Sequence, residues 1–136
     1  MRELAWLDAN VILRYLLRDR EDLFRRAAAL FARAEAGTLT LLISPLTLAE
    51  AVWVLDSFYG YPRQTICAAL GDFLASPGVE PEEREVLLAA LEDYRDRNVD
   101  FIDAYLFRHA VAKGVARICS FDEKHLRRLG TELEPL

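Results

Sequence analysis

The sequence predicts a three-layer α/β/α fold, in which helices cover both faces of a central parallel sheet of four to five strands. Short apolar segments of strand length alternate along the chain with longer segments whose apolar residues recur at helical spacing. This alternation is typical of a parallel sheet whose strands are joined by helices. The 136 residues contain no repeats, linkers or low-complexity stretches, so we expect one domain over residues 1–136.

The first half of the chain is expected to contain two strands and four helices. Gly37 ends the second helix, Ser44 caps the third, and Pro45 occupies the first helical position of that third helix. A Gly-Tyr-Pro break at 60–62 then separates the third helix from the fourth. In order, we expect a strand over 3–7, helices over 9–18 and 22–35, a strand over 38–43, and helices over 45–59 and 63–75.

The second half is expected to add three helices and the remaining strands. A Ser-Pro-Gly turn leads into a very short strand, and a helix with an apolar inner side follows it. Asp100 caps the next helix, and Gly114 ends it. The expected elements are a short strand within 76–81, helices over 82–96 and 101–113, a strand over 115–120, a short helix over 122–128, and an edge strand at 132–134.

Composition narrows the class of protein. No apolar run approaches the roughly 20 residues that cross a bilayer, and the N-terminus has no signal-peptide pattern. Cys67 and Cys119 are unpatterned, as expected for two buried thiols in a reducing cytoplasm. The net charge of −5 argues against nonspecific nucleic-acid binding through overall charge, but it leaves local binding open.

Four acidic residues interrupt apolar segments in different parts of the chain, and they are Asp8, Glu50, Asp103 and Asp122. A charged carboxylate in an apolar setting is costly unless its charge is compensated. Ligands of open α/β sheets bind at the carboxyl ends of the strands, and the predicted elements allow all four acids to point to one such edge. We therefore expect these acids to share a divalent cation.

The chemistry expected of such a centre is metal-assisted attack of water on a phosphodiester. Mg²⁺ is bound by a few carboxylates together with waters and phosphate oxygens. The sequence has no His/Cys cluster that would predict zinc. We expect His109 to be packed in a helix rather than catalytic, and His125 to be exposed.

Structural explanations compete with this interpretation. Asp8 and Asp122 could each cap the helix that follows, and Asp103 could complete a capping box begun by Asp100. For Asp100 we favour the role of helix cap over that of a fifth acid of the site. Glu50 has the weakest structural explanation, because it lies beyond the first turn of its helix.

Surface residues leave two further alternatives open. The arginines of the first two helices could line an RNA path, or they could form a solvated, salt-bridged surface with the acids beside them. These arginines are Arg14, Arg18, Arg25 and Arg26. The Ala-rich helix over 22–35, with Phe24, Leu30 and Phe31, is a candidate surface for a dimer or for a protein partner.

Four ordered motifs resemble those of PIN-domain nucleases of the VapC toxin type, and together they cover nearly the whole chain. They are Leu-Asp-Ala-Asn-Val-Ile-Leu-Arg at 7–14, Ser-Pro-Leu-Thr-Leu-Ala-Glu-Ala-Val-Trp-Val-Leu at 44–55, Asp-Phe-Ile-Asp-Ala at 100–104, and Ser-Phe-Asp at 120–122.

The resemblance implies an Mg²⁺- or Mn²⁺-dependent endoribonuclease that prefers single-stranded RNA. By resemblance, Asp8, Glu50, Asp103 and Asp122 are the catalytic acids that hold the metal, with Asn10 in or just behind the metal's ligand shell. Toxins of this type are usually neutralised by a small antitoxin, and many form homodimers. The resemblance thus implies the toxin of a toxin–antitoxin pair, and the unpatterned cysteines lead us to expect it in the cytoplasm.

One position departs from the family pattern. The residue between the first Asp and the Asn is usually Thr or Ser, and here it is Ala9. The missing hydroxyl supports the alternative of a weak or inactive PIN module that binds RNA or a protein partner. A phosphatase with Asp8 as nucleophile is a further alternative, but such enzymes usually carry a second acid where this chain has Asn10.

Overall fold

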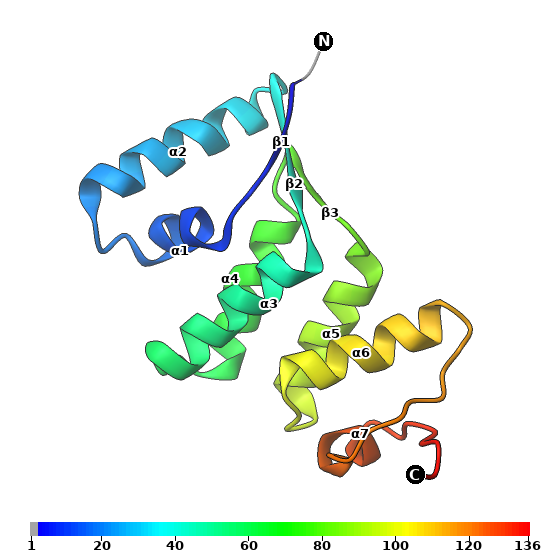
Figure 1. Ribbon diagram of the computed structural model, residues 1–136. Coiled ribbons are helices and arrows are strands. Elements are labelled where there is room, and N and C mark those ends of the chain that lie inside the picture. Colours follow the sequence, from blue (N-terminus) through cyan, green and yellow to red (C-terminus); the bar gives the residue numbers. More distant parts are fainter. Residues whose placement is uncertain (1–2) are drawn as a thin grey trace. The chain divides into compact units, whose positions relative to one another are not determined.

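Three short parallel strands form the sheet of the computed structural model, which describes residues 3–136 (Figure 1). They are β1 (Glu3–Trp6), β2 (Leu39–Ile43) and β3 (Val79–Pro81). The order is β1-β2-β3, so β2 is central, and Leu41 lies opposite both Ala5 and Val79. The fold class is therefore α/β with a parallel sheet flanked by helices, as the sequence predicts.

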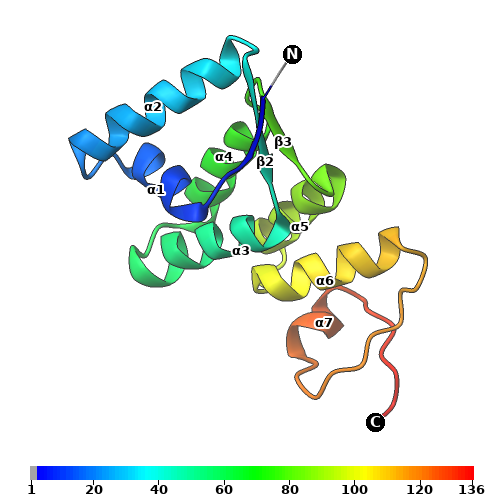
Figure 2. The same cartoon turned by 45° about the horizontal axis from the view of Figure 1, so that its top comes forward.

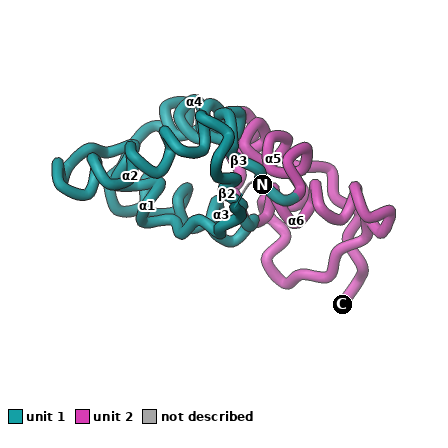
Figure 3. The backbone as a smooth tube through the Cα atoms, turned by 90° about the horizontal axis from the view of Figure 1, so that it is seen from above, with its two compact units in different colours: residues 1–82 teal, residues 83–136 magenta. Residues whose placement is uncertain are grey.

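The chain divides into two compact units, one ending at Glu82 and the other starting at Glu83 (Figure 3). Unit 1 contains the sheet and the helices α1 (Ala9–Leu17), α2 (Glu21–Glu35), α3 (Pro45–Trp53) and α4 (Arg63–Leu74), with a π-helical segment, Val54–Phe58, that continues α3. Within this unit α2 packs against β2, α4 packs against β3, and α1 packs against both α2 and α3. The largest fully buried side chains here are Ile12, Leu41, Ile43, Leu48, Ile66, Leu70 and Leu74.

Unit 2 is built on a helix pair, α5 (Arg84–Asp96) and α6 (Phe101–Ala112), followed by the short α7 (Lys124–Arg128). Helix α7 lies beside α6 (Figure 2). A small apolar cluster of Ala110, Ile118 and Leu126, with Leu133 against it, joins α6, α7 and the C-terminal segment. This unit therefore has buried apolar contacts of its own, and they position α7 relative to α6.

The helix ends follow the predicted capping residues. The Ser44 hydroxyl accepts from the Thr47 N–H at 3.2 Å, and the Asp100 carboxylate accepts from the Asp103 N–H at 2.8 Å. Both bonds satisfy N–H groups that the first turn of a helix leaves without a helical partner. Across residues 3–136, no helix is long and apolar enough to cross a membrane.

The sheet is the main difference from the sequence prediction, because the described residues show three strands and a sheet of four to five is not confirmed. The segments predicted as strands at 115–120 and 132–134 meet through a single parallel bridge between Ile118 and Leu133. Ile118 is buried, whereas Val115 is 71% exposed and Cys119 is exposed. One buried residue gives little apolar contact to hold a longer ladder in place.

Candidate active site

In unit 1 the structure brings Asp8 and Glu50 to the same edge of the sheet. Asp8 follows β1, and its carboxylate caps α1 by accepting from the Ala9 N–H at 2.9 Å. Glu50 lies in α3, which follows β2, the parallel neighbour of β1. The Thr47 hydroxyl donates to the carbonyl of Leu7 at 3.3 Å and so ties the start of α3 to the end of β1. Glu50 lies one turn beyond Thr47, on the same side of the helix.

These two acids are exposed, and so is Asp122, which corrects the expectation that their apolar surroundings bury them. The apolar neighbours of Asp8, Leu7 and Ala9, point into the core instead, with 4% and 0% of their surface exposed. A carboxylate at the surface keeps its hydration, so burial gives no reason for a cation beside these acids. Evidence for a metal site must therefore come from acidic side chains that lie close to one another.

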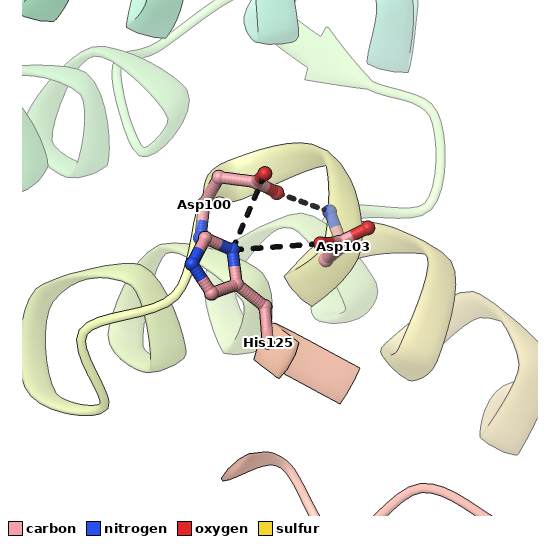
Figure 4. Close-up of side chains that lie close together, drawn as sticks. All are labelled: Asp100, Asp103 and His125. Carbon is pink, nitrogen blue, oxygen red and sulfur yellow. Dashed lines mark hydrogen bonds and ion pairs between the residues drawn. The ribbon is translucent and has the colours of Figure 1, made fainter. Parts of the chain in front are cut away.

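Unit 2 contains such a group of close side chains, formed by Asp100, Asp103 and His125 (Figure 4). The His125 Nδ1 atom lies 3.3 Å from Asp100 Oδ2 and 3.5 Å from Asp103 Oδ2. One potential ligand atom from each of the three residues lies within 4.8 Å of the other two. The group combines the N-terminal turn of α6 with the short helix α7, which the apolar cluster of unit 2 holds beside it.

Asp103 is the electrostatic centre of this group. Burial raises the pKa of its carboxyl group, the negative charges of Asp100 and Asp122 raise that pKa further, and His125 acts in the opposite direction. Three carboxylates that influence one another in this way repel when ionised, and a cation among them relieves the repulsion. Two carboxylates and an imidazole nitrogen are suitable ligands for a divalent metal ion.

Asp122 is held in this region by a tight turn. The Ser120 hydroxyl donates to the backbone carbonyl of Asp122 at 2.9 Å and accepts from its N–H at 3.0 Å. Helix α7 starts at Lys124, and the residue at its cap position is Glu123, so Asp122 does not cap it. The capping explanation therefore applies to Asp8 and to Asp100, but not to Asp122.

His125 is the residue that the sequence interpretation missed. It was expected to be exposed, but its side chain is only 27% exposed and faces two carboxylates. One feature of the sequence could have pointed to His125. It lies three residues after Asp122 in a segment predicted to be helical, and residues three apart share a helix face. His109 behaves as expected, since it is half-buried and paired with Glu83.

The arginines of α1 and α2 form mostly a salt-bridged surface. Arg14 pairs with Asp19, and Glu21 accepts from Arg18 at 3.1 Å and lies 3.7 Å from Arg25. Arg26 forms no ion pair among residues 3–136. It lines a groove of about 550 Å³ between α1 and α2, together with Asn10, Val11, Arg14, Leu23, Ala27 and Leu30.

A protein-family model described as the PIN domain matches residues 5–131 of the chain. The match runs through both units and includes all four acids of the sequence prediction, as well as Asp100 and His125. A search of curated proteins finds no relative of the chain.

Proposed function

The chain belongs to the PIN domain family, whose members are generally metal-dependent nucleases, and on that basis we propose that it is an endoribonuclease that uses Mg²⁺ or Mn²⁺. The observation that carries the proposal is the convergence of Asp100, Asp103 and His125, with the charge of Asp122 acting on Asp103. Such a group is the expected ligand set for a divalent cation, and hydrolysis of phosphodiesters is the chemistry that it serves.

We propose that Asp8, Glu50, Asp103 and Asp122 are the catalytic acids. A bound divalent ion would supply polarisation of a nonbridging phosphate oxygen and a lowered pKa for the attacking water. These carboxylates would hold such an ion, and Asp122 or Glu50 would orient the water and accept its proton. Attack of the water at phosphorus would break the P–O3′ bond, leaving a 5′-phosphate on one product and, once the departing oxygen takes up a proton from solvent, a 3′-hydroxyl on the other.

RNA is the proposed substrate, and the groove between α1 and α2 is the proposed path for it. Its lining includes Asn10, two residues after Asp8, and the cationic side chain of Arg26. A guanidinium that has no ion pair among the described residues is available to a phosphate oxygen. Arg26→Ala is expected to weaken the binding of single-stranded RNA and to leave binding of Mn²⁺ unchanged. Equal RNA affinity of variant and wild type would remove this groove from the proposal.

The direct experiment is cleavage of end-labelled single-stranded RNA, double-stranded RNA and single-stranded DNA by purified protein with Mg²⁺, with Mn²⁺ or with EDTA. We expect metal-dependent cleavage of single-stranded RNA and 5′-phosphate ends on the products. Binding of metal and RNA without any cleavage would instead indicate an inactive PIN module. Cleavage that persists in EDTA would contradict the proposed mechanism.

We further propose that the protein is a cytoplasmic toxin, neutralised by a small cognate antitoxin, and that residues 1–136 act as one domain. The family match across both units supports the single domain. Among residues 3–136 neither Cys67 nor Cys119 forms a disulfide, which fits a reducing compartment. Cys67 is buried as expected, whereas Cys119 is exposed. Growth arrest on expression, relieved by the product of a neighbouring gene, would test the toxin role.

A homodimer is proposed from exposed apolar side chains of α6. Ile102 and Leu106 are 58% and 40% exposed, and they lie four residues apart on one helix face. The candidate surface on α2 is less available than expected, because Phe24 and Phe31 both pack against Tyr15 of α1. Leu106→Glu is expected to give a monomer in light scattering, whereas Val115→Glu, at another exposed site, is not. A wild-type monomer would refute the dimer.

A further inference from the structure

His125 occupies a position that the acids alone do not explain. Its Nδ1 atom accepts a hydrogen bond from the Asp100 N–H at 3.0 Å and at the same time faces one carboxylate oxygen of Asp100 and one of Asp103. A neutral ring that accepts this bond has no proton on Nδ1 to donate, and the two carboxylate oxygens that Nδ1 faces are acceptors as well. A cation that displaced the Asp100 N–H from Nδ1 would be bound by three electron-pair donors that already lie close together.

The spacing of these atoms suits a metal. Two ligands that each lie about 2.1 Å from one ion are separated by roughly 3.0 Å at a right angle and roughly 3.4 Å at a tetrahedral angle. The distances from Nδ1 to the two carboxylate oxygens, 3.3 Å and 3.5 Å, are close to these values. An ion bound to Nδ1 would replace the hydrogen bond from the Asp100 N–H.

We propose that His125 is a direct ligand of the catalytic ion, beside Asp100 and Asp103, and that it makes this centre prefer first-row transition-metal dications to Mg²⁺. The inference rests on the proposed metal-dependent function. Mg²⁺ prefers oxygen ligands and dehydrates reluctantly, whereas an imidazole nitrogen is a good ligand for transition-metal ions. The nitrogen ligand therefore favours Mn²⁺, and Co²⁺ and Ni²⁺ still more, over Mg²⁺.

Pulsed electron paramagnetic resonance of the Mn²⁺-loaded protein tests the ligand directly. The chain has two histidines, His109 and His125, so a ¹⁴N coupling from a bound imidazole can be assigned by substitution. We expect the coupling in the wild type, its loss in His125→Gln, and its retention in His109→Gln, since His109 is paired with Glu83. Mn²⁺ bound without a nitrogen coupling in the wild type, or a coupling that survives in His125→Gln, would overturn the inference.

Metal affinities give a second readout. In calorimetric titrations of the full chain, His125→Gln is expected to lower the affinity for Mn²⁺ about 10-fold or more and to change the affinity for Mg²⁺ by less than about 3-fold. Equal losses for both ions would mean that His125 only supports the fold of the site. Unchanged Mn²⁺ affinity would mean that it forms an ion pair with the two acids and nothing more.

Neither measurement depends on RNA cleavage, so the two proposals can fail separately. Nitrogen-ligated Mn²⁺ in a protein that cuts no RNA would sustain the role of His125 and remove the nuclease assignment. Metal-dependent cleavage without a nitrogen coupling would sustain the nuclease assignment and remove the role of His125 as a metal ligand.

Discussion

Asp103 is the residue at which stability and the proposed activity oppose each other. Its backbone N–H is satisfied by the cap from Asp100, but its carboxylate is partly buried among other acids. A group of this kind destabilises the metal-free protein and becomes favourable once a cation is bound. Residues of functional sites often carry such a cost.

Replacing this carboxylate should therefore raise the stability of the metal-free protein. Asp103→Asn keeps the shape of the side chain and removes its charge, so the repulsion from Asp100 and Asp122 disappears. In thermal melts with EDTA at neutral pH we expect the midpoint to rise by a few degrees. A lower midpoint than that of the wild type would show that the carboxylate contributes to the fold.

A second prediction concerns Ala9. The Ser or Thr that the family usually has at this position would carry a hydroxyl that does not reach the surface. Ala9 has 0% of its surface exposed, although Asp8 and Asn10 on either side are exposed. A Ser or Thr here would place its hydroxyl inside the unit. Ala9→Ser should change the cleavage rate by less than about 3-fold, which is under 1 kcal/mol of activation free energy. A gain of 100-fold would show that the missing hydroxyl belongs to the active site.

At the scale of elements, the α5–α6 pair depends on one buried acid. Asp93 in α5 is 3% exposed, and its two carboxylate oxygens accept from Arg108 of α6 at 2.6 Å and 2.8 Å. Arg97, the C-terminal cap residue of α5, lies 3.5 Å from the same carboxylate. This paired contact fixes α6, and therefore Asp103, relative to the helix before it.

Replacing Arg108 should lower the free energy of unfolding far more than is usual for a side chain that is partly exposed. Arg108→Ala leaves the Asp93 charge buried with its main partner removed, and we expect a loss of about 3 kcal/mol in the free energy of unfolding. Arg95→Ala is the matched control, since the contact between Arg95 and Asp96 is exposed and should contribute under about 1 kcal/mol. Denaturant titrations that give equal losses for the two variants would contradict this account.

A second contact between these helices predicts a dependence on pH. Glu83 adopts a left-handed backbone with φ of 52° at the start of α5, and it accepts from the Tyr105 hydroxyl of α6 at 2.6 Å and from His109. Burial alone would raise the pKa of Glu83, but the hydrogen bonds from Tyr105 and His109 outweigh it and hold that pKa below its usual range.

Because the pKa of this acid is lowered in the folded state, its stabilising contribution is present above the unfolded value and is lost as the pH falls through the folded value. Tyr105→Phe should therefore be less stable than the wild type at pH 7 by about 1 kcal/mol. The difference should shrink as the pH falls below the usual range of a glutamate and through the lowered pKa of Glu83. Denaturant titrations at several pH values that show a constant difference would refute this coupling.

At the scale of the whole molecule, the sequence predicts the order and type of elements well where local signals are strong. The Ser44-Pro45 start of α3 and the Asp100 cap of α6 are both found. The segments after Gly114 are less predictable, because Val115 and Ile118 suggest a strand by composition, yet only Ile118 finds a buried position. Whether such a segment pairs depends on tertiary contacts that no local pattern contains.

The candidate site shows the same limit. The sequence singles out Asp103 because an acid interrupts an apolar segment there, and in the structure this carboxylate lies close to Asp100 and His125. It cannot select His125, because the meeting of α6 and α7 depends on packing around Ala110, Ile118 and Leu126. It also overstates burial, because an apolar neighbourhood in sequence says nothing about the side of the chain on which Asp8 or Glu50 lies.

Asp8, Glu50, Asp103 and Asp122 are proposed to serve a metal-dependent ribonuclease. The most direct test compares wild type, Asp103→Asn and the exposed control Asp72→Asn on single-stranded RNA with Mn²⁺ and with EDTA. We expect cleavage by the wild type and by Asp72→Asn in Mn²⁺ only, and a loss of about 100-fold or more in Asp103→Asn, the size that loss of a metal-site contact can reach. Equal cleavage by all three proteins would contradict the account, as would cleavage that EDTA does not stop.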